Sequence, residues 1–139
     1  MKLEKIINDC KPVKTVGKTE REVTDVVIDS RQVKPDNMFI AVHGTQVDGH
    51  DYIEKAIAQG AGTIVCERLP EQPNPNVTYL QYESTEKVAG ILATHFNGDP
   101  TSRMCLVGVT GTNGKTTIAT LLFRIFQRMG YKCGLCSTV

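Results

Sequence analysis

Long apolar runs and net charge are both scarce in this sequence of 139 residues. No run approaches the ~18 apolar residues that indicate a membrane-spanning helix. The first ten residues are amphipathic and carry too many charges for the apolar region of a signal peptide. The formal net charge is only +1, so whole-chain electrostatics predict neither nucleic acid nor an anionic membrane as a partner. We therefore expect a cytoplasmic protein.

Cysteine and histidine are too few to form an obvious disulfide framework or metal site. The five cysteines are odd in number, and we interpret the four in apolar or strand-like stretches as reduced core thiols: Cys66, Cys105, Cys133 and Cys136. Cys133 and Cys136 have the C-x-x-C spacing of a redox motif or half a zinc site. No second cysteine pair or histidine pair has matching spacing, so the sequence disfavours both roles.

The composition is that of an ordinary globular protein, with 40% hydrophobic and 22% charged residues. The charge is unevenly distributed. Residues 1–97 carry 11 basic and 14 acidic side chains, a balance of −3, whereas residues 98–139 carry 5 and 1, a balance of +4. Asn97-Gly-Asp-Pro100 is the clearest linker in the chain. We predict two domains, 1–97 and 98–139.

Strand and helix patterns alternate in the first domain. The apolar run 38–42 lacks alternation, which is typical of a strand buried on both faces. Ser84 is predicted to cap a helix that extends to Phe96. The other predicted elements are helices at 2–9 and 51–59 and strands at 13–16, 23–28, 63–66 and 77–80. This order predicts a small α/β domain.

The second domain contains a glycine-containing loop, Val109 to Thr117, between a predicted strand at 104–108 and a predicted helix at 116–129. Glycines allow successive amide groups to point at an anion, and the helix adds the positive end of its dipole. In a nucleotide-phosphate loop ending Gly-Lys-Thr, Lys115 would reach the β- and γ-phosphates and the Thr116 hydroxyl would hold Mg²⁺. The general pattern places a glycine where this chain has Val109.

A further strand is predicted at 132–137, which makes this region the first β–loop–α–β segment of a nucleotide-binding domain. About 40 residues cannot bury both faces of such strands. We therefore expect the chain to be part of a larger protein, with an unpaired strand and apolar surface left exposed. Self-association or partial disorder after residue 100 is the expected consequence.

A second candidate site follows two strands of the first domain. Asp29-Ser-Arg31 and Gly44–His50 each come directly after a predicted strand, and ligands bind at that edge of open α/β sheets. Serine, threonine and glutamine offer neutral hydrogen bonds, while Arg31 and His50 suit a phosphate. The alternative is turn chemistry, with Asp29 and Asp48 as local caps.

These segments, taken in order, resemble the Mur ligases. The matching stretches are Asp-Ser-Arg at 29–31, Phe-Ile-Ala-Val-x-Gly-x-x-x-Asp-Gly-His at 39–50, Ala-Ile-x-x-Gly-Ala at 56–61 and Gly-Val-Thr-Gly-Thr-Asn-Gly-Lys-Thr-Thr at 108–117. The resemblance is strongest to the ligases that add the third residue of the peptidoglycan peptide. Thr-Gly-Thr-Asn-Gly-Lys-Thr is that family's own phosphate loop, which accounts for Val109.

The resemblance implies a three-domain enzyme that uses ATP and Mg²⁺. Its N-terminal domain would hold the UDP end of a UDP-N-acetylmuramoyl-dipeptide, its central domain ATP, and its C-terminal domain the amino acid. ATP would phosphorylate the dipeptide carboxylate, and the amine would displace phosphate to form an amide. Much of the central domain and all of the C-terminal domain would lie outside these residues. We therefore expect no ligation by this chain alone, and the added amino acid is left open.

The resemblance also assigns individual residues. Lys115 would act in catalysis and Thr116 would bind the metal. The ATP loop would comprise Gly111, Thr112, Asn113, Gly114, Lys115, Thr116 and Thr117. The uridine-nucleotide contacts would be Ile28, Ser30, Thr45, Gln46 and Val47, in a loop shaped by Asp48, Gly49 and His50.

Two other functions stay open on sequence grounds. A different phosphate-loop kinase or NTPase would leave residues 1–97 as an unrelated module. A non-enzymatic module that binds a UDP-sugar would use only the first domain. The loops within 29–50 favour the ligase, because a kinase has no need of both in front of its phosphate loop.

Overall fold

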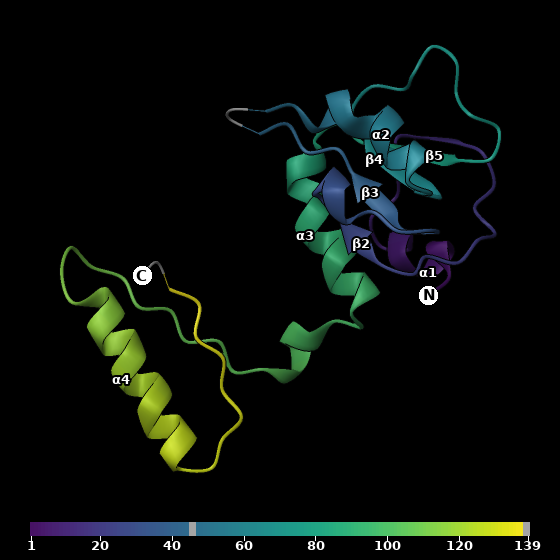
Figure 1. Cartoon of the computed structure of the whole chain (residues 1–139). Coiled ribbons are helices and arrows are strands. Elements are labelled where there is room, and N and C mark those ends of the chain that lie inside the picture. The colour runs from purple at the N-terminus through teal and green to yellow at the C-terminus, as the bar shows by residue number, and fades with distance from the viewer. Residues whose placement is uncertain (45–46, 138–139) are drawn as a thin grey trace. The chain divides into compact units, whose positions relative to one another are not determined.

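The computed structural model describes residues 1–44 and 47–137. The chain forms two compact units, Met1–Arg103 and Met104–Val139 (Figure 1). The first unit continues past the predicted linker into a short 3-10 turn, η3 (Pro100–Arg103). The division therefore falls six residues later than our predicted boundary after residue 97, and the two units are described separately below.

The first unit is built on a five-stranded sheet in the order β1-β5-β4-β3-β2. The strands β2, β3, β4 and β5 are parallel, and β1 pairs antiparallel with β5 at one edge. Their bounds are β1 Lys14–Val16, β2 Val26–Val27, β3 Met38–Ile40, β4 Thr63–Cys66 and β5 Thr78–Gln81. The mixed α/β fold predicted from the sequence is confirmed.

Helices cover both faces of this sheet, as its buried central strands require. One face packs against α2 (Ile53–Ala58), in a core that includes Phe39, Ile64 and Tyr79. The other face packs against α1 (Leu3–Ile7) and α3 (Thr85–Phe96), in a core that includes Met38, Ile40 and Leu80. Figure 1 shows the sheet between these helices. Successive strand residues thus alternate between two cores.

Two local features show how side chains set the element bounds. Only Val26–Val27 of the predicted strand 23–28 forms a strand, β2. The Val23 amide bonds instead to the Met1 carbonyl at 2.7 Å, and the Val23 side chain packs beside α1. The predicted cap of α3 is confirmed, since the Ser84 hydroxyl accepts from the Lys87 amide at 3.4 Å. The helix predicted at 51–59 begins as a 3-10 turn, η2 (Gly49–Tyr52), and continues as α2.

The second unit contains one long helix, α4 (Lys115–Arg128). The strands predicted at 104–108 and 132–137 are wrong for this chain, because the structure assigns no strand there. A strand is defined by hydrogen bonds to a neighbour, and within the described part of this unit neither segment pairs with one. Their apolar side chains are accordingly exposed, Leu106 by 91%.

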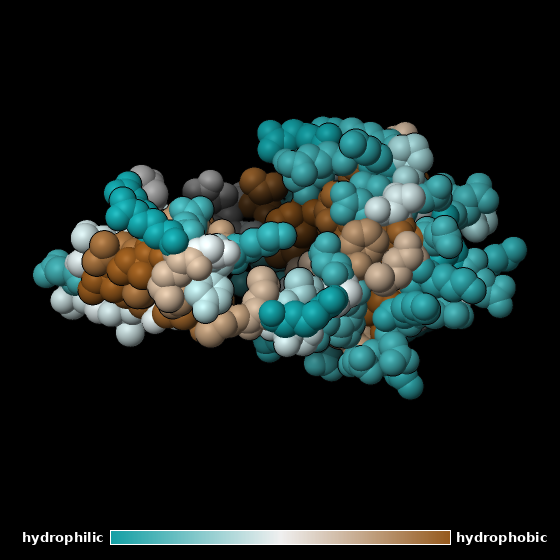
Figure 2. All heavy atoms as spheres, turned by 90° about the horizontal axis from the view of Figure 1, so that it is seen from below, coloured by the Kyte–Doolittle hydropathy of each residue, from teal (hydrophilic) through white to brown (hydrophobic). Residues whose placement is uncertain are grey.

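An apolar face runs along α4, formed by Ile118, Leu121, Ile125 and Met129 at helical spacing. All four side chains are exposed, and hydrophobic surface is visible on this unit in Figure 2. We call these four residues the α4 apolar face. A helix with such a face normally gains its stability by packing it against a sheet or another helix.

The cysteines differ from our interpretation as core thiols. Cys66 is buried, and burial raises the pKa of its thiol to about 11. Cys105 and Cys136 are exposed and Cys133 is half-buried, because the strands predicted to bury them do not form. Among the described residues, no group of histidine, cysteine and acidic side chains could hold a metal ion. In the same residues, no helix is both long and apolar enough to cross a membrane.

Candidate functional site

The candidate site lies at the edge of the sheet where the four parallel strands end. Because β2, β3, β4 and β5 run in one direction, the segments that follow them meet at the same edge. We call this the carboxyl edge, made of residues 28–33, 41–44, 47–52, 67–68 and 82–85. It brings together both loops that the sequence singled out.

The first loop is a tight turn held by Asp29 and Arg31. Asp29 caps the 3-10 turn η1 (Ser30–Gln32) by accepting the Arg31 amide at 2.9 Å. The Arg31 guanidinium also grips that carboxylate, with Nη2 at 2.8 Å from Oδ2 and Nε at 3.0 Å from Oδ1. These bonds from the Arg31 side chain and then its backbone lower the pKa of Asp29 to about 2. Asp29 therefore acts as a local cap, as the turn-chemistry alternative holds.

The side chains around this turn differ in exposure. Ser30 is buried, whereas Ile28 is 66% exposed although it directly follows β2. Arg31 has an 80% exposed side chain despite its ion pair. The turn therefore presents an apolar side chain and a guanidinium to solvent.

The second loop is a hairpin. His43 and Asp48 form an isolated antiparallel bridge, and the Gly44 amide bonds to the Val47 carbonyl at 3.0 Å. The Val47 side chain is 54% exposed. We call His43, Gly44, Val47 and Asp48 the hairpin stem. The expected contact residues Thr45 and Gln46 lie outside the described residues.

Gly49 joins the hairpin to η2 at a point with no room for a side chain. Its amide donates to the Val42 carbonyl at 2.9 Å. A Cβ at this position would lie 2.7 Å from both the nitrogen and the carbonyl oxygen of Val42, and the three atoms nearest to it all belong to the backbone. Glycine is therefore required here for close approach of two main-chain segments.

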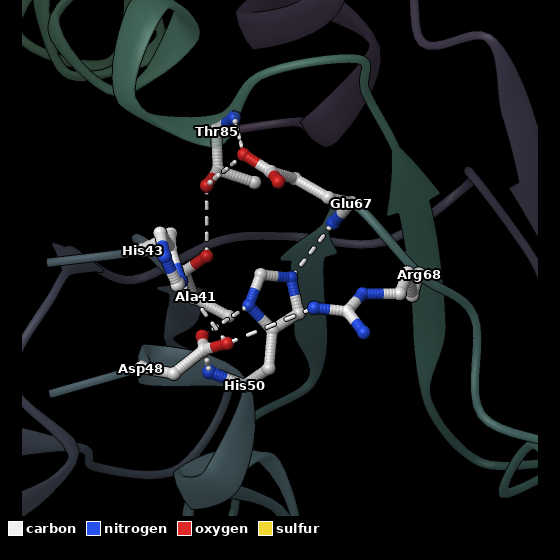
Figure 3. A network of polar contacts seen from close by, with 7 residues as sticks. All are labelled: Ala41, His43, Asp48, His50, Glu67, Arg68 and Thr85. Carbon is white, nitrogen blue, oxygen red and sulfur yellow. Dashed lines mark hydrogen bonds and ion pairs between the residues drawn. The ribbon is translucent and has the colours of Figure 1, made fainter.

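Asp48 is the centre of a polar network at the carboxyl edge (Figure 3). It accepts the His50 amide at 2.9 Å and the His50 ring Nδ1 at 2.6 Å. Its other oxygen lies 3.1 Å from His43 Nδ1 and 3.9 Å from Arg68. The backbone bond from His50 and then its ring bond hold the pKa of Asp48 well below its ordinary value. Asp48 is thus an ionised carboxylate whose oxygens accept hydrogen bonds from several groups of the protein.

His50 faces into the protein, where we had expected it to suit a phosphate. Its Nε2 accepts the backbone amide of Glu67 at 2.9 Å, while Nδ1 meets Asp48. The side chain is only 13% exposed. Both ring nitrogens are therefore engaged, so the expected phosphate contact is wrong in this arrangement. Its role in shaping the loop fits the geometry.

Sequence reasoning missed Glu67 and Thr85. The Glu67 carboxylate accepts the Thr85 amide at 2.9 Å, at the first turn of α3, and lies 3.2 Å from the Thr85 hydroxyl. That hydroxyl donates to the Ala41 carbonyl at 2.8 Å. The signal was present, because both residues follow parallel strands and so reach the same edge. A carboxylate of the protein thus already satisfies the N-terminus of α3.

The N-terminus of α4 is open by comparison. The residue before it, Gly114, has φ +77° and offers no side-chain cap, and Gly111 has φ +141°. Ile118 is the first helix residue whose amide bonds to a carbonyl, that of Gly114 at 2.9 Å. Within the described chain, the amides of 115–117 have no protein acceptor. The Lys115 ammonium folds back onto the loop carbonyls of Gly111 and Thr112.

The free amides and the Lys115 ammonium are hydrogen-bond donors that suit a polyphosphate, and the positive-φ glycines give the loop the backbone shape that such a site uses. This fit concerns the loop predicted from sequence, Gly111 to Thr117. In the structure Gly111 to Gly114 form the segment just ahead of α4, and Lys115, Thr116 and Thr117 are the first three residues of the helix. The Thr116 hydroxyl lies on the first helical turn, where phosphate-loop threonines meet Mg²⁺.

A family model described as "Mur ligase family, catalytic domain" matches residues 22–97, which is more than half of the chain. The chain belongs to the Mur ligase family. This confirms the resemblance drawn from the ordered motifs. The match covers β2 to α3 and therefore every loop of the carboxyl edge.

Individual Mur ligases are similar over much or all of the chain. The UDP-N-acetylmuramoyl-L-alanyl-D-glutamate–2,6-diaminopimelate ligase of Phocaeicola vulgatus is 57% identical over all 139 residues. The structure of MurF ligase from Thermotoga maritima in complex with ADP is 30% identical, with a TM-score of 0.58 over 75% of this chain and 23% of that one. A solved UDP-N-acetylmuramoyl-L-alanyl-D-glutamate–2,6-diaminopimelate ligase shares the fold, with a TM-score of 0.67 at 22% identity over 94% of this chain and 26% of its own. The chain spans 29% of the length of the Phocaeicola relative.

Proposed function

We propose that this chain supplies the uridine-nucleotide site and the ATP phosphate loop of a ligase that joins an amino acid to a UDP-N-acetylmuramoyl-dipeptide. The observation that carries the proposal is the presence of two separate ligand-ready features in one Mur ligase chain. One is the pair of loops at the carboxyl edge, and the other is the open N-terminus of α4. The names of the similar ligases support the substrate class and favour 2,6-diaminopimelate as the amino acid.

The uridine-nucleotide site is proposed at the carboxyl edge. Ile28 and Val47 are exposed apolar side chains that follow neighbouring strands, and they suit the faces of a uracil ring. Ser30 lies in the capped turn that follows Ile28 and offers a neutral hydrogen bond. Thr45 and Gln46 complete the proposed contacts on sequence grounds. The network around Asp48 is occupied internally and is assigned no substrate contact.

The ATP phosphates are proposed to bind the loop Gly111 to Thr117. The amides of this loop would donate to phosphate oxygens, and Lys115 would exchange its two loop carbonyls for the β- and γ-phosphates. Lys115 is therefore the proposed catalytic residue and Thr116 the proposed Mg²⁺ ligand. When bound, ATP and Mg²⁺ supply the phosphoryl chemistry that activates the dipeptide carboxylate. Because ATP and UDP-sugars are supplied in the cytoplasm, we place the whole enzyme there.

Titration calorimetry with each ligand separately tests this proposal. The chain should bind UDP-N-acetylmuramoyl-L-alanyl-D-glutamate, and it should bind ATP with Mg²⁺ independently. Lys115→Ala should remove only the second response. If the chain bound ATP but not the UDP compound, the result would instead support a different phosphate-loop enzyme. If it bound the UDP compound but not ATP, the result would support a module without nucleotide chemistry. If neither ligand bound, the proposal would be overturned.

A further inference from the structure

A continuous set of hydrogen bonds links three segments of the carboxyl edge (Figure 3). Asp48 belongs to the hairpin stem after β3, Glu67 follows β4, and Thr85 begins α3. His50 stands between the first two, bonded to Asp48 through one ring nitrogen and to the Glu67 backbone through the other. The Glu67 side chain then reaches Thr85. The hairpin is thereby coupled to the strand and helix beside it.

The chemistry of these partners determines the protonation of His50. The Glu67 backbone amide can only donate, so Nε2 must carry a lone pair and no proton. Asp48 is a carboxylate that can only accept, so Nδ1 must carry the proton. One neutral tautomer satisfies both bonds, and it fixes the orientation of the ring. Because both ring nitrogens are bonded, the ring also fixes the position of the segment that bonds to it through Asp48.

The segment that the His50 ring holds is the hairpin stem. Asp48 accepts from His50 through the ring and the backbone, and the same carboxylate meets His43 across the hairpin. The Arg68 contact to Asp48 is long, at 3.9 Å, and its side chain is 80% exposed, so it adds little. His50 therefore provides the close, sheltered link between the stem and β4.

We infer that His50 is a positioning residue for the uridine-nucleotide site. It holds the hairpin stem, and Val47 with it, in the geometry that receives the ligand, without contacting the ligand itself. This inference rests on the proposed function, because the ligand is the UDP end of the proposed substrate. A preorganised loop binds more tightly because less conformational freedom is lost on binding.

The test compares His50→Leu with a matched control, His95→Leu, because leucine has neither a hydrogen-bond donor nor an acceptor in its side chain. His95 also uses its ring to reach the main chain, with Nδ1 at 2.8 Å from the Ile6 carbonyl, but it ties α3 to α1 away from the hairpin. Both variants lose one histidine tether in the same unit. Urea unfolding measures the stability of each, and calorimetry measures binding of UDP-N-acetylmuramoyl-L-alanyl-D-glutamate and of ATP.

His50→Leu should weaken binding of the UDP compound by about tenfold, with ATP binding unchanged. His95→Leu should leave both affinities unchanged, whatever its cost in stability. Equal affinity for the UDP compound in His50→Leu and the wild-type chain, or an equal loss in both variants, would overturn the inference and leave the proposed function standing. Failure of the wild-type chain to bind the UDP compound would overturn both.

Discussion

Replacing Gly49 by alanine puts the packing of the carboxyl edge to a direct test. The new Cβ would lie 2.7 Å from the nitrogen and from the carbonyl oxygen of Val42, and 3.0 Å from the Ala41 carbonyl carbon. All three contacts are main chain, so no side-chain rotation can relieve them. The hairpin must move away from β3, and the 2.9 Å bond from the Gly49 amide to Val42 lengthens with it.

The magnitude follows from these contacts. Overpacking costs about 1–3 kcal/mol, and the weakened hydrogen bond costs about 1 kcal/mol more. Alanine recovers about 0.5–1 kcal/mol by restricting the unfolded chain. We therefore expect Gly49→Ala to lower the free energy of unfolding by about 1–3.5 kcal/mol. Because the chain has no tryptophan, urea unfolding is best followed by far-UV circular dichroism.

Gly90→Ala is the matched control. Gly90 lies inside α3, is exposed, and has nothing within 4 Å of the position a Cβ would take. This second substitution should stabilise the protein by about 0.5–1 kcal/mol, since glycine is unfavourable within a helix. The reasoning is refuted if Gly49→Ala unfolds at the same urea concentration as the wild type or if the two variants behave alike.

Three further predictions address charge, nucleotide and association. The lowered pKa of Asp48 means that its carboxylate stabilises the fold above the ordinary aspartate value of 3.8 and loses this effect as pH falls. Asp48→Asn should thus be less sensitive to acid than the wild type in urea titrations between about pH 5 and about pH 2; an identical acid response would contradict this. Lys115→Ala should abolish ATP binding in calorimetry while changing stability by less than about 0.5 kcal/mol, because Lys115 is exposed. The α4 apolar face should drive self-association in light scattering, and Leu121→Glu should reduce it; a wild-type monomer would refute that expectation.

The sequence predicts the first unit well because its signals are local and strong. The apolar run 38–42 and the β-branched segment 63–66 became β3 and β4, and Ser84 became the cap of α3. Val23 shows where prediction from local composition fails. It is a residue type that favours strands, yet it lies outside β2 and its side chain packs in the core beside α1.

The second unit shows a different limit. Segments 104–108 and 132–137 have strand-like composition, but a strand also needs a partner, and composition carries no information about one. The helix between them formed as predicted, because its hydrogen bonds are internal to the segment. The exposed Cys105 and Cys136 follow from the same difference.

The candidate site divides along similar lines. The phosphate loop and the two strand-end loops are contiguous motifs, so the sequence placed them on the correct connections. The bonds of His50 to Glu67 and of Glu67 to Thr85 join residues 17 and 18 positions apart. Such pairings depend on the order of strands in the sheet. The sequence alone therefore suggested that His50 could contact a phosphate, whereas in the structure its ring bonds to Asp48 and to the Glu67 backbone.

Amide chemical-shift mapping of the isotopically labelled chain, titrated with UDP-N-acetylmuramoyl-L-alanyl-D-glutamate, tests the central claim most directly. The uridine-nucleotide site at the carboxyl edge predicts shifts at Ile28 to Arg31 and His43 to His50, with the first turn of α4 unchanged. Addition of ATP and Mg²⁺ should then move Gly111 to Thr117. Saturable binding of the UDP compound that leaves both carboxyl-edge loops unshifted would contradict the account.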